Sequence, residues 1–496
     1  MSQPNLVLIT CDQLRADTLG CAGHPVVQTP HIDLLARRGV RFTQAYSTTP
    51  VCVPARAIIM TGLDGHHLGN TGGKPGFQIP VRQTLPRLLS DAGYHTQVVG
   101  KMHVYPERCH YGFHSMLLWE EGRPFGKSGG RHRGYGDYED WLAEQGYPGQ
   151  AFGHGMANNA YSMTPWHLPD RLHPTEWIGT ESCRAIKRRD WTRPLFLWAS
   201  FTAPHPPLTP LLRDLYAYDQ VPMPTPVMGD WTARHPLFHR KKIAQFSGET
   251  MTAMRQQLAY RAYYASVTHV DRQINRIIGT LREEGMLDNT WLIFTADHGD
   301  NLGDHGLWAK SNFLRGACNI PLVVAPPLRG DPDEHVAPGW MPGGTASAVV
   351  GLQDLLPTLA ELAGTEAQER VDGASLLPIV RKTDESLRSF IVGEFGVIGA
   401  RSLMVTDGKW KYIWYEQDGR ELLFDIADDP DEMRDLASLR PDVRATYVDK
   451  LVQTLAARDG DPALRDGQLR PAEPGRQLSA LELARLPNDR LPRGLH

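Results

Sequence analysis

The run from Cys52 to Gly62 places a cysteine, a proline and an arginine at a spacing typical of a reactive site. Pro54 suits the first turn of a helix, and the apolar residues 57–60 continue as a helical face. Cys52 would then lie at a helix N-terminus beside the Arg56 guanidinium, where free N–H groups and positive charge favour an anion. The pattern indicates a side chain that meets an oxyanion. A buried inert thiol and an unmodified thiolate nucleophile are the alternatives.

Ionisable side chains also follow four short apolar runs that are typical of buried parallel strands. The runs and the residues that follow them are 6–10 with Asp12, 95–99 with Lys101 and His103, 195–198 with His205, and 291–295 with Asp297 and His298. Helical patterns separate the runs, and strands that alternate with helices predict a doubly wound α/β sheet. Because ligands bind beyond the carboxyl ends of such strands, we expect these side chains to form the active site of an enzyme.

The elements that must position these residues can also be predicted. Helices are expected at 32–38, 85–92 and about 251–284, and a further strand at 322–324. A core-facing stripe in the longest helix is predicted for Met254, Leu258, Ala265, Ile274, Ile278 and Leu281. Two stretches with little regular pattern, about 105–171 and 208–246, predict insertions that cover the site and choose the substrate.

The pattern changes after about residue 383. Short alternating strands are expected at 402–405, 410–414 and 421–424, separated by Asp-Gly turns and followed by a helix at about 441–457. We therefore expect a largely parallel sheet flanked by helices over 1–382, a smaller C-terminal antiparallel-sheet subdomain over 383–461, and a tail over 462–496. The tail is expected to be an oligomerisation arm, with loose order as the alternative.

The composition excludes several classes of protein. The 496 residues are 41% hydrophobic and 22% charged, as in an ordinary globular protein, and the formal net charge of -4 gives no case for nucleic-acid binding. Six irregularly spaced cysteines form neither a disulfide framework nor a zinc pattern. No apolar stretch approaches the length of a membrane span, and residues 1–5 lack the features of a signal peptide, so the expected location is the cytoplasm.

The first run resembles the first signature of the sulfatases of the alkaline phosphatase superfamily, Cys-x-Pro-x-Arg followed by Thr-Gly. The matching residues are Cys52, Pro54, Arg56, Thr61 and Gly62, with Ala55 where serine is frequent. Segments 100–103, 203–207 and 297–310 resemble further signatures of the same family. The resemblance covers Asn5 to about Leu436 and implies the alkaline phosphatase-like fold. It also implies that Cys52 is converted after translation to formylglycine, whose hydrated aldehyde is the nucleophile.

The resemblance implies one divalent cation held by Asp12, Asp297, His298 and the modified Cys52. Carboxylates suit a hard cation, so Ca²⁺ is the expected ion. Two positions depart from many relatives. This chain has Gln13 where they carry a second aspartate, and His298 where they carry an asparagine. The imidazole favours Mn²⁺ or Zn²⁺ as alternatives. Both departures resemble the phosphonate monoester hydrolase branch of the superfamily.

The resemblance also implies catalytic roles. Lys310 and His205 would contact the sulfate and protonate the leaving oxygen. Arg56 and Lys101 would neutralise the oxyanion charge. His103 would deprotonate the second hydroxyl of the hydrated aldehyde, so that sulfate is released and the aldehyde restored. Taken singly, each of these side chains is more often a cap, a structural residue or a surface charge. Their order along the chain supports the catalytic interpretation.

Other polar residues near the motifs are expected in supporting positions. Gln13 is expected behind the metal ligands. Asn70 and the pair 66–67 follow the first signature, where a substrate contact is an alternative to a structural role. Asp300 and Asp304 are expected to be loop and capping residues.

Three functions remain open at this point. The first is a sulfuric ester hydrolase of arylsulfatase type, acting on a small aryl or carbohydrate sulfate. The second is a phosphonate monoester or phosphodiester hydrolase with the same site. The third is a catalytically silent binding protein in which Cys52 stays a thiol. The expected partners are a small sulfate ester, the formylglycine-generating maturation enzyme and a second copy of the chain, with neither nucleic acid nor membrane.

Overall fold

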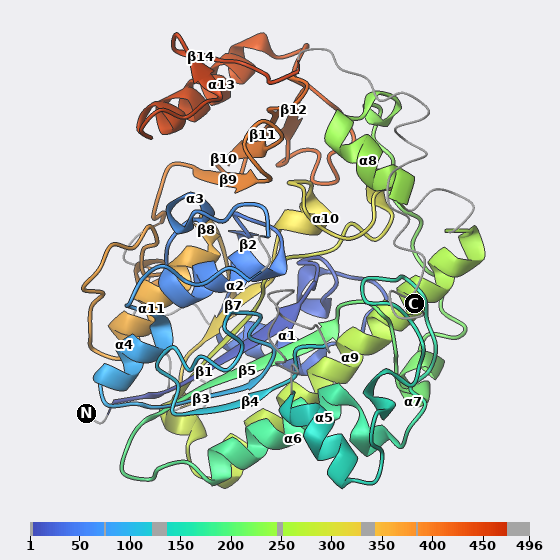
Figure 1. Ribbon diagram of the computed structural model, residues 1–496, viewed down its shortest axis with the longest axis vertical. Coiled ribbons are helices and arrows are strands. Elements are labelled where there is room, and N and C mark those ends of the chain that lie inside the picture. Colours follow the sequence, from blue (N-terminus) through green and yellow to red (C-terminus); the bar gives the residue numbers. More distant parts are fainter. Residues whose placement is uncertain are drawn as a thin grey trace.

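One eight-stranded sheet forms the centre of the protein in the computed structural model, which describes residues 3–73, 76–121, 136–245, 251–328, 343–382 and 385–473 (Figure 1). The strands are β1 Asn5–Asp12, β2 Val40–Tyr46, β3 His95–Gly100, β4 Ser115–Leu118, β5 Leu195–Pro204, β6 Thr290–Ala296, β7 Leu322–Ala325 and β8 Gly344–Gly351. Their order is β4-β3-β5-β1-β6-β7-β2-β8, and only β7 runs antiparallel to its neighbours within this sheet. The predicted doubly wound, largely parallel sheet is confirmed.

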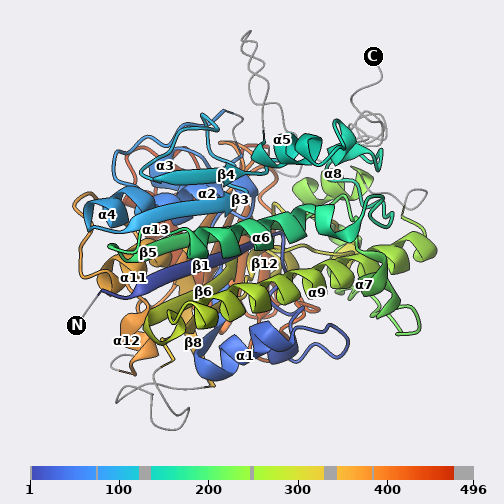
Figure 2. The ribbon, with the colours of Figure 1, turned by 90° about the horizontal axis from the view of Figure 1, so that it is seen from below.

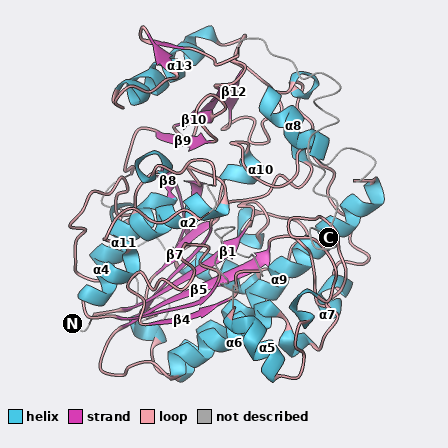
Figure 3. Cartoon of the chain, in the orientation of Figure 1, coloured by secondary structure: helices cyan, strands magenta, loops and turns pink. Residues whose placement is uncertain are grey.

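Helices cover both faces of the sheet, as Figures 2 and 3 show. The helices are α1 Pro30–Arg38, α2 Cys52–Thr61, α3 Gly65–Leu68, α4 Leu85–Asp91, α5 Asp137–Glu144, α6 Pro174–Lys187, α7 Leu212–Tyr216, α8 Leu237–Gln245, α9 Ala253–Glu283, α10 Arg315–Cys318, α11 Leu355–Leu362, α12 Leu377–Val380 and α13 Pro441–Ala456. On one face α6 and α9 pack together against β5, with α1 beside α9, and on the other α2, α4 and α11 pack together. Among the described residues, no helix has both the length and the apolar character needed to cross a bilayer.

The predicted strands correspond to β1, β3, β5, β6 and β7. In β1, β5 and β6 the residues are almost entirely buried, because helices exclude water from both faces, and such strands appear in the sequence as continuous apolar runs. The strands β2, β4 and β8 were not predicted. Arg41 and Gln44 interrupt β2, while Gly344, Thr345 and Ser347 interrupt the edge strand β8.

The predicted core-facing stripe of the long helix is correct only for its later part. Ala265, Ile274, Ile278 and Leu281 are buried in α9, whereas Met254 and Leu258 are 75% and 36% exposed. Burial along α9 begins at Ala259, so the first turns of the helix extend beyond the elements that cover the rest of it.

A separate antiparallel sheet of four strands follows, in the order β12-β11-β10-β9. Its strands are β9 Ile391–Phe395, β10 Ser402–Thr406, β11 Trp410–Tyr415 and β12 Glu421–Asp425. The helix α13 packs against β10 and β11, as the pattern predicted, whereas β9 was not predicted. A short hairpin, β13 Leu464–Arg465 and β14 Gln468–Leu469, forms the start of the predicted tail, and residues 474–496 lie outside the described residues.

Candidate active site

Four neighbouring parallel strands bring the predicted residues to one edge of the sheet. In the order β3-β5-β1-β6, the strands end at or just before Lys101, His205, Asp12 and Asp297. The close approach of β3 to β5 depends on Gly100, because a Cβ there would lie 1.9 Å from the Ser200 carbonyl oxygen. The sheet therefore delivers these side chains to one place, as the topology predicts.

Cys52 is the first residue of α2 and lies within this group of side chains. Its Sγ is 3.1 Å from His298 Nε2 and 3.6 Å from Asp12 Oδ1, and only 3% of the residue is exposed. Burial and the Asp12 carboxylate raise the pKa of the thiol, but the cationic groups of Lys310, His298 and Lys101 outweigh them and lower it. The thiol therefore faces a charged site and not an apolar interior.

The donor atoms of Asp12, Cys52, Asp297 and His298 all lie within 4.8 Å of one another and are buried. His298 Nδ1 lies 3.0 Å from the Gly299 carbonyl oxygen, which can only accept a hydrogen bond, so Nδ1 carries the proton and Nε2 faces the group. Two carboxylates, one imidazole nitrogen and the side chain of residue 52 are a donor set that fits a divalent cation.

Arg56 is a fully buried counter-ion beside these donors. Its Nε donates to Asp297 Oδ2 at 2.8 Å, and its Nη1 donates to Ser200 Oγ at 2.8 Å and to the Lys101 carbonyl oxygen at 2.5 Å. In the described part of the chain, Nη2 has no hydrogen-bond partner, and it lies 3.9 Å from Asp12 Oδ2. One guanidinium N–H group is therefore available to an oxyanion at residue 52.

Lys101 forms a second ionic contact, with Glu121, a residue that the sequence motifs did not indicate. Lys101 Nζ donates to Asp12 Oδ2 and to Glu121 Oε2, the latter at 2.6 Å. Asp12, Glu121 and His205 could also hold a cation by their spacing, but the Lys101 ammonium already bonds both carboxylates. The acidic pair 120–121, separated from β4 only by Trp119, is a signal that could have indicated Glu121, had β4 been predicted.

Lys310 and His205 form a further contact pair of the site. Lys310 Nζ is 2.8 Å from His205 Nε2 and also donates to Gln13 Oε1. His205 Nδ1 donates to the Pro206 carbonyl oxygen at 2.6 Å, so Nε2 accepts from the ammonium. The Gln13 amide donates to Asp300 Oδ2 at 2.6 Å, which leaves its oxygen facing Lys310. Gln13 and Asp300 thus support the lysine.

The other predicted residues have more varied positions. His103 is buried, and its backbone N–H bonds to the Glu120 carboxylate at 2.9 Å. Asn70 is buried and follows Gly69, the residue that ends α3. His67 Nδ1 lies 2.6 Å from Asp372 Oδ2, which belongs to the segment between α11 and α12.

Several non-glycine residues around the site have a left-handed backbone conformation, which residues with a side chain rarely adopt. Gln13 and His103 have φ angles of 67° and 54°, and Ala309 and Ser311 on either side of Lys310 have 62° and 78°. Non-glycine residues with positive φ persist only where the surrounding structure fixes them, and they cluster at functional sites.

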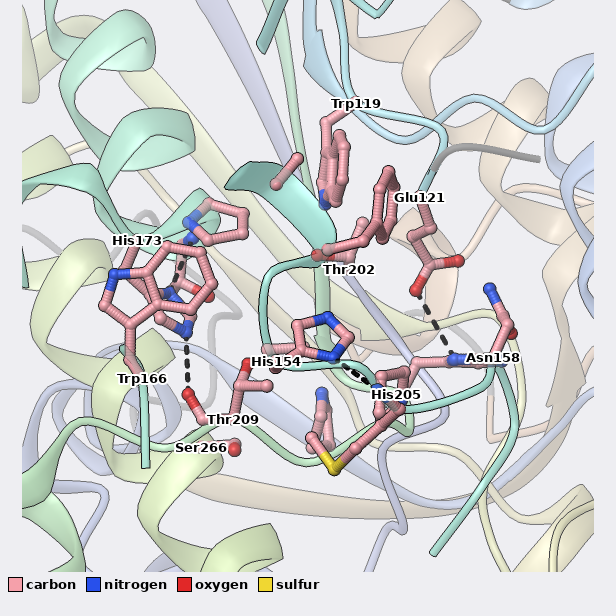
Figure 4. A pocket seen from close by; sticks show the side chains of 18 of the residues that line it. Trp119, Glu121, His154, Asn158, Trp166, His173, Thr202, His205, Thr209 and Ser266 are labelled. Atoms are coloured by element: carbon pink, nitrogen blue, oxygen red, sulfur yellow. Dashed lines mark hydrogen bonds and ion pairs between the residues drawn. The ribbon is translucent and has the colours of Figure 1, made fainter. Parts of the chain in front are cut away.

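A cavity of about 690 Å³ adjoins these residues. We call it the aromatic cavity, because Trp119, Phe152, His154, Trp166 and His173 line much of it, with Glu121 and His205 at the side facing the strand ends (Figure 4). The Trp119 and Phe152 rings stack with centroids 5.6 Å apart. Many of these residues come from the stretch 105–171, whereas the stretch 208–246 supplies Thr209. The volume of the aromatic cavity is typical of a pocket that binds a small organic molecule.

Comparison with known proteins agrees with this geometry. The sequence model of the sulfatase family matches residues 4–365. The chain is 34% identical over 468 residues to an arylsulfatase of Clostridium perfringens, covering 92% of this chain and 95% of that protein. It is 30% identical over 446 residues to a choline-sulfatase of Rhizobium meliloti, covering 88% and 82%.

The fold is also similar to that of the phosphonate monoester hydrolase of Agrobacterium radiobacter, with a TM-score of 0.77, 26% identity and coverage of 92% of this chain and 96% of that chain. A buried cysteine among strand-end acids, an adjoining cavity and the family match over most of the chain lead to the same conclusion. The chain belongs to the sulfatase family of the alkaline phosphatase superfamily and is a sulfate ester hydrolase.

Proposed function

We propose that the chain hydrolyses sulfate monoesters of arylsulfatase type, with residue 52 as formylglycine and one divalent cation. The observation that carries the proposal is the position of Cys52 Sγ, 3.1 Å from His298 Nε2 and within a buried group of four metal donors. This position at the start of α2 combines free backbone N–H groups with nearby cations, which is where an attacking oxyanion is stabilised.

Asp12, Asp297, His298 and residue 52 would hold the cation. A bound divalent cation supplies charge that lowers the pKa of a hydroxyl group beside it. Hydrated formylglycine supplies a hydroxyl nucleophile together with a second hydroxyl, whose deprotonation releases the sulfate. Ca²⁺ is the proposed ion because the carboxylates and a hydroxyl of residue 52 are oxygen donors, and the His298 imidazole makes Mn²⁺ and Zn²⁺ the ions to compare with it.

The surrounding side chains complete the chemistry. The ammonium of Lys310 and the imidazole of His205, 2.8 Å apart, bind the ester and pass a proton to the leaving oxygen. Arg56 and Lys101 neutralise the charge that spreads over the oxyanion. His103 takes a proton at residue 52, so that the aldehyde is restored for the next cycle.

The aromatic cavity is the proposed site of the leaving group. Stacked rings such as Trp119 and Phe152 suit a flat apolar alcohol, which agrees with the arylsulfatase relative. The choline-sulfatase relative names a second class of alcohol, a cationic one, which aromatic rings also bind.

The rival activity is hydrolysis of phosphonate monoesters or phosphodiesters by the same residues. Gln13 and His298 support it, as does the similar fold of a phosphonate monoester hydrolase. Parallel values of kcat/KM for 4-nitrophenyl sulfate and 4-nitrophenyl phenylphosphonate decide between the two. A preference for the phosphonate ester by orders of magnitude would replace the first activity with the second.

Mass spectrometry of the peptide that contains Cys52 tests the modification. After co-expression with a maturation enzyme, the peptide should lose sulfur and gain oxygen. An unmodified thiol in a protein without turnover would instead support a silent binding protein. Titration of metal ions into the chelated, matured protein identifies the cation by restored turnover. The maturation enzyme as a partner, a homo-oligomer, the cytoplasmic location and the boundaries at 382 and 461 stay predictions.

A further inference from the structure

Among the described residues, Glu121 is a carboxylate that contacts Lys101 and His205 and also lines the aromatic cavity. We propose that Glu121 is a charge filter that makes the site reject dianionic phosphate monoesters in favour of monoanionic esters. This inference rests on the proposed function, because it concerns the selectivity of the same site.

The geometry places this carboxylate at the boundary between the strand ends and the aromatic cavity. Glu121 Oε2 accepts from Lys101 Nζ at 2.6 Å, and Oε1 lies 3.4 Å from His205 Nδ1. The side chain is 9% exposed and lines the cavity. Figure 4 shows its carboxylate pointing toward His205 from the loop after β4, with a dashed line for this contact.

The contacts mean that Glu121 neutralises part of the charge that an anionic substrate would meet. Lys101 bonds two carboxylates, Asp12 and Glu121, so its single positive charge is shared between them. The Asp12 carboxylate is also a proposed metal ligand, whereas Glu121 faces the cavity. The charge of Glu121 is thus the one that an incoming ester approaches.

An extra negative charge acts differently on esters of different charge. A sulfate monoester and a phosphonate monoester each carry one negative charge, whereas a phosphate monoester carries two well above its second pKa of about 6. At a poorly hydrated site, unit charges a few ångströms apart interact strongly, and a dianion is repelled about twice as strongly as a monoanion. Glu121 therefore disfavours the phosphate monoester relative to the other two, which a carboxylate that merely holds Lys101 in place would not do.

The experiment compares three esters of 4-nitrophenol at pH 8: the sulfate, the phosphate and the phenylphosphonate. It uses the matured, metal-loaded protein and its Glu121→Gln and Glu121→Asp variants. In Glu121→Gln we expect the ratio of kcat/KM for the phosphate over the sulfate to rise at least about tenfold, with little change in the ratio for the phenylphosphonate over the sulfate. Glu121→Asp keeps the charge and should keep both ratios.

Three results would overturn the proposal. One is an unchanged phosphate-to-sulfate ratio in Glu121→Gln, with all three esters losing kcat/KM together, which is the result of a purely structural role. Another is an equal gain in kcat/KM, relative to the sulfate, for both phosphorus esters in Glu121→Gln, which would indicate that Glu121 selects esters by shape and not by charge. The third is a gain for the phosphate in Glu121→Asp as well. If Glu121→Gln does not fold, Glu121→Ala removes the same charge and must also raise the phosphate-to-sulfate ratio of kcat/KM.

A binding measurement separates this proposal from the proposed function. Calorimetric affinities for phenyl phosphate and phenyl sulfate need no turnover, and their ratio should shift toward the phosphate in Glu121→Gln. A parent protein that binds both esters but hydrolyses neither would contradict the proposed function, and the ratio of affinities would still decide the role of Glu121. An unchanged ratio of affinities would contradict the charge filter even in an active sulfatase.

Discussion

The strand-end cluster, formed by Asp12, Cys52, Arg56, Lys101, Asp297 and His298, and the aromatic cavity adjoin each other but are built in different ways. The cluster comes from the ends of β1, β3 and β6 and the first two turns of α2, and its side chains are buried and bonded to one another. The cavity is lined mainly by loop residues, some of which are exposed, such as Phe152 at 44%. The sheet fixes the groups that do the chemistry, and loops that can vary independently choose the ester.

If the cluster is fixed by its internal ion pairs, removing one of its charges should destabilise the whole protein. We expect Arg56→Ala to lower the free energy of unfolding by about 3–5 kcal/mol, because it leaves the buried Asp297 carboxylate without its partner at 2.8 Å. Turnover should be lost as well. Urea unfolding of the metal-free protein measures the first effect.

Arg370→Ala is the matched control for this variant. Arg370 also pairs with an aspartate, at 3.1 Å from Asp372, but its side chain is 66% exposed, so we expect a loss of at most about 1 kcal/mol. Equal losses in the two variants would show that the pair in the cluster is no more important for stability than a surface pair.

His205 lies where the cluster meets the cavity, and it should affect activity far more than folding. We expect His205→Ala to lower kcat/KM about 10²–10⁴-fold for esters of poor leaving groups, because proton transfer to the leaving oxygen accelerates a reaction by about this factor. The loss should be smaller for 4-nitrophenyl sulfate, whose leaving oxygen needs less protonation. Kinetics over a series of phenyl sulfates measures this slope.

His67→Ala is the control, since His67 contacts Asp372 and not the cluster. Its kcat/KM should match that of the parent protein. A loss in His205→Ala that is the same for every leaving group would assign His205 to binding of the sulfate and not to proton transfer.

The two regions also differ in how far the sequence predicts them. Most of the cluster could be predicted because Asp12, Lys101, Asp297 and His298 follow apolar runs, and parallel strands bring such positions together whatever the loops do. Cys52 and Arg56 were indicated by their spacing at the start of a helix. The orientation of the Gln13 amide could not be predicted, because it depends on Asp300 and Lys310, nearly 300 residues away in the chain. Glu121 was missed because β4, which precedes it, lies in a stretch without regular alternation.

The cavity was predicted only as an insertion of unknown content. Its aromatic side chains occur in the sequence as isolated tryptophans and a phenylalanine between glycines and histidines, a pattern equally typical of core packing. Only tertiary packing brings Trp119 next to Phe152 and places both in the wall of the same cavity as Ser266 of α9. A wall built from distant segments leaves no local spacing for a sequence pattern to show.

If the cavity selects the ester, a change in its wall should affect aryl esters alone. We expect Phe152→Ala to lower kcat/KM about tenfold for 4-nitrophenyl sulfate and much less for ethyl sulfate, because a half-buried ring contributes about 1–1.5 kcal/mol to contact with an aromatic group. Metal affinity should stay unchanged. Trp191→Ala is the control, since Trp191 is 73% exposed and does not line the cavity. Equal losses for both esters would show that Phe152 acts on the cluster.

The smallest expected effect concerns Glu176 of α6, which directly follows the cavity-lining residues Pro174 and Thr175. Its carboxylate lies 2.9 Å from Arg213 Nη2 and from Arg276 Nη1, and 3.2 Å from His269 Nε2. Burial raises the pKa of Glu176, but the hydrogen bond and charge of His269 and the charges of Arg276 and Arg213 outweigh it and lower the pKa from 4.5 to about 2.

A carboxyl group with a lowered pKa stabilises the folded state above its unfolded pKa, and this stability is lost as the pH falls toward the folded value. We therefore expect Glu176→Gln to lower the free energy of unfolding at pH 7 by about 1–2 kcal/mol, less than the full shift implies because solvent screens the partly exposed pair. The difference between parent and variant should shrink steadily as the pH falls from about 5 toward 2, since protonation then removes the same charge from the parent. Urea unfolding across this range measures it. A difference at pH 3 as large as at pH 7 would mean that Glu176 acts through packing, and the start of α6, which lines the cavity at Pro174 and Thr175, would then be held by shape as well as charge.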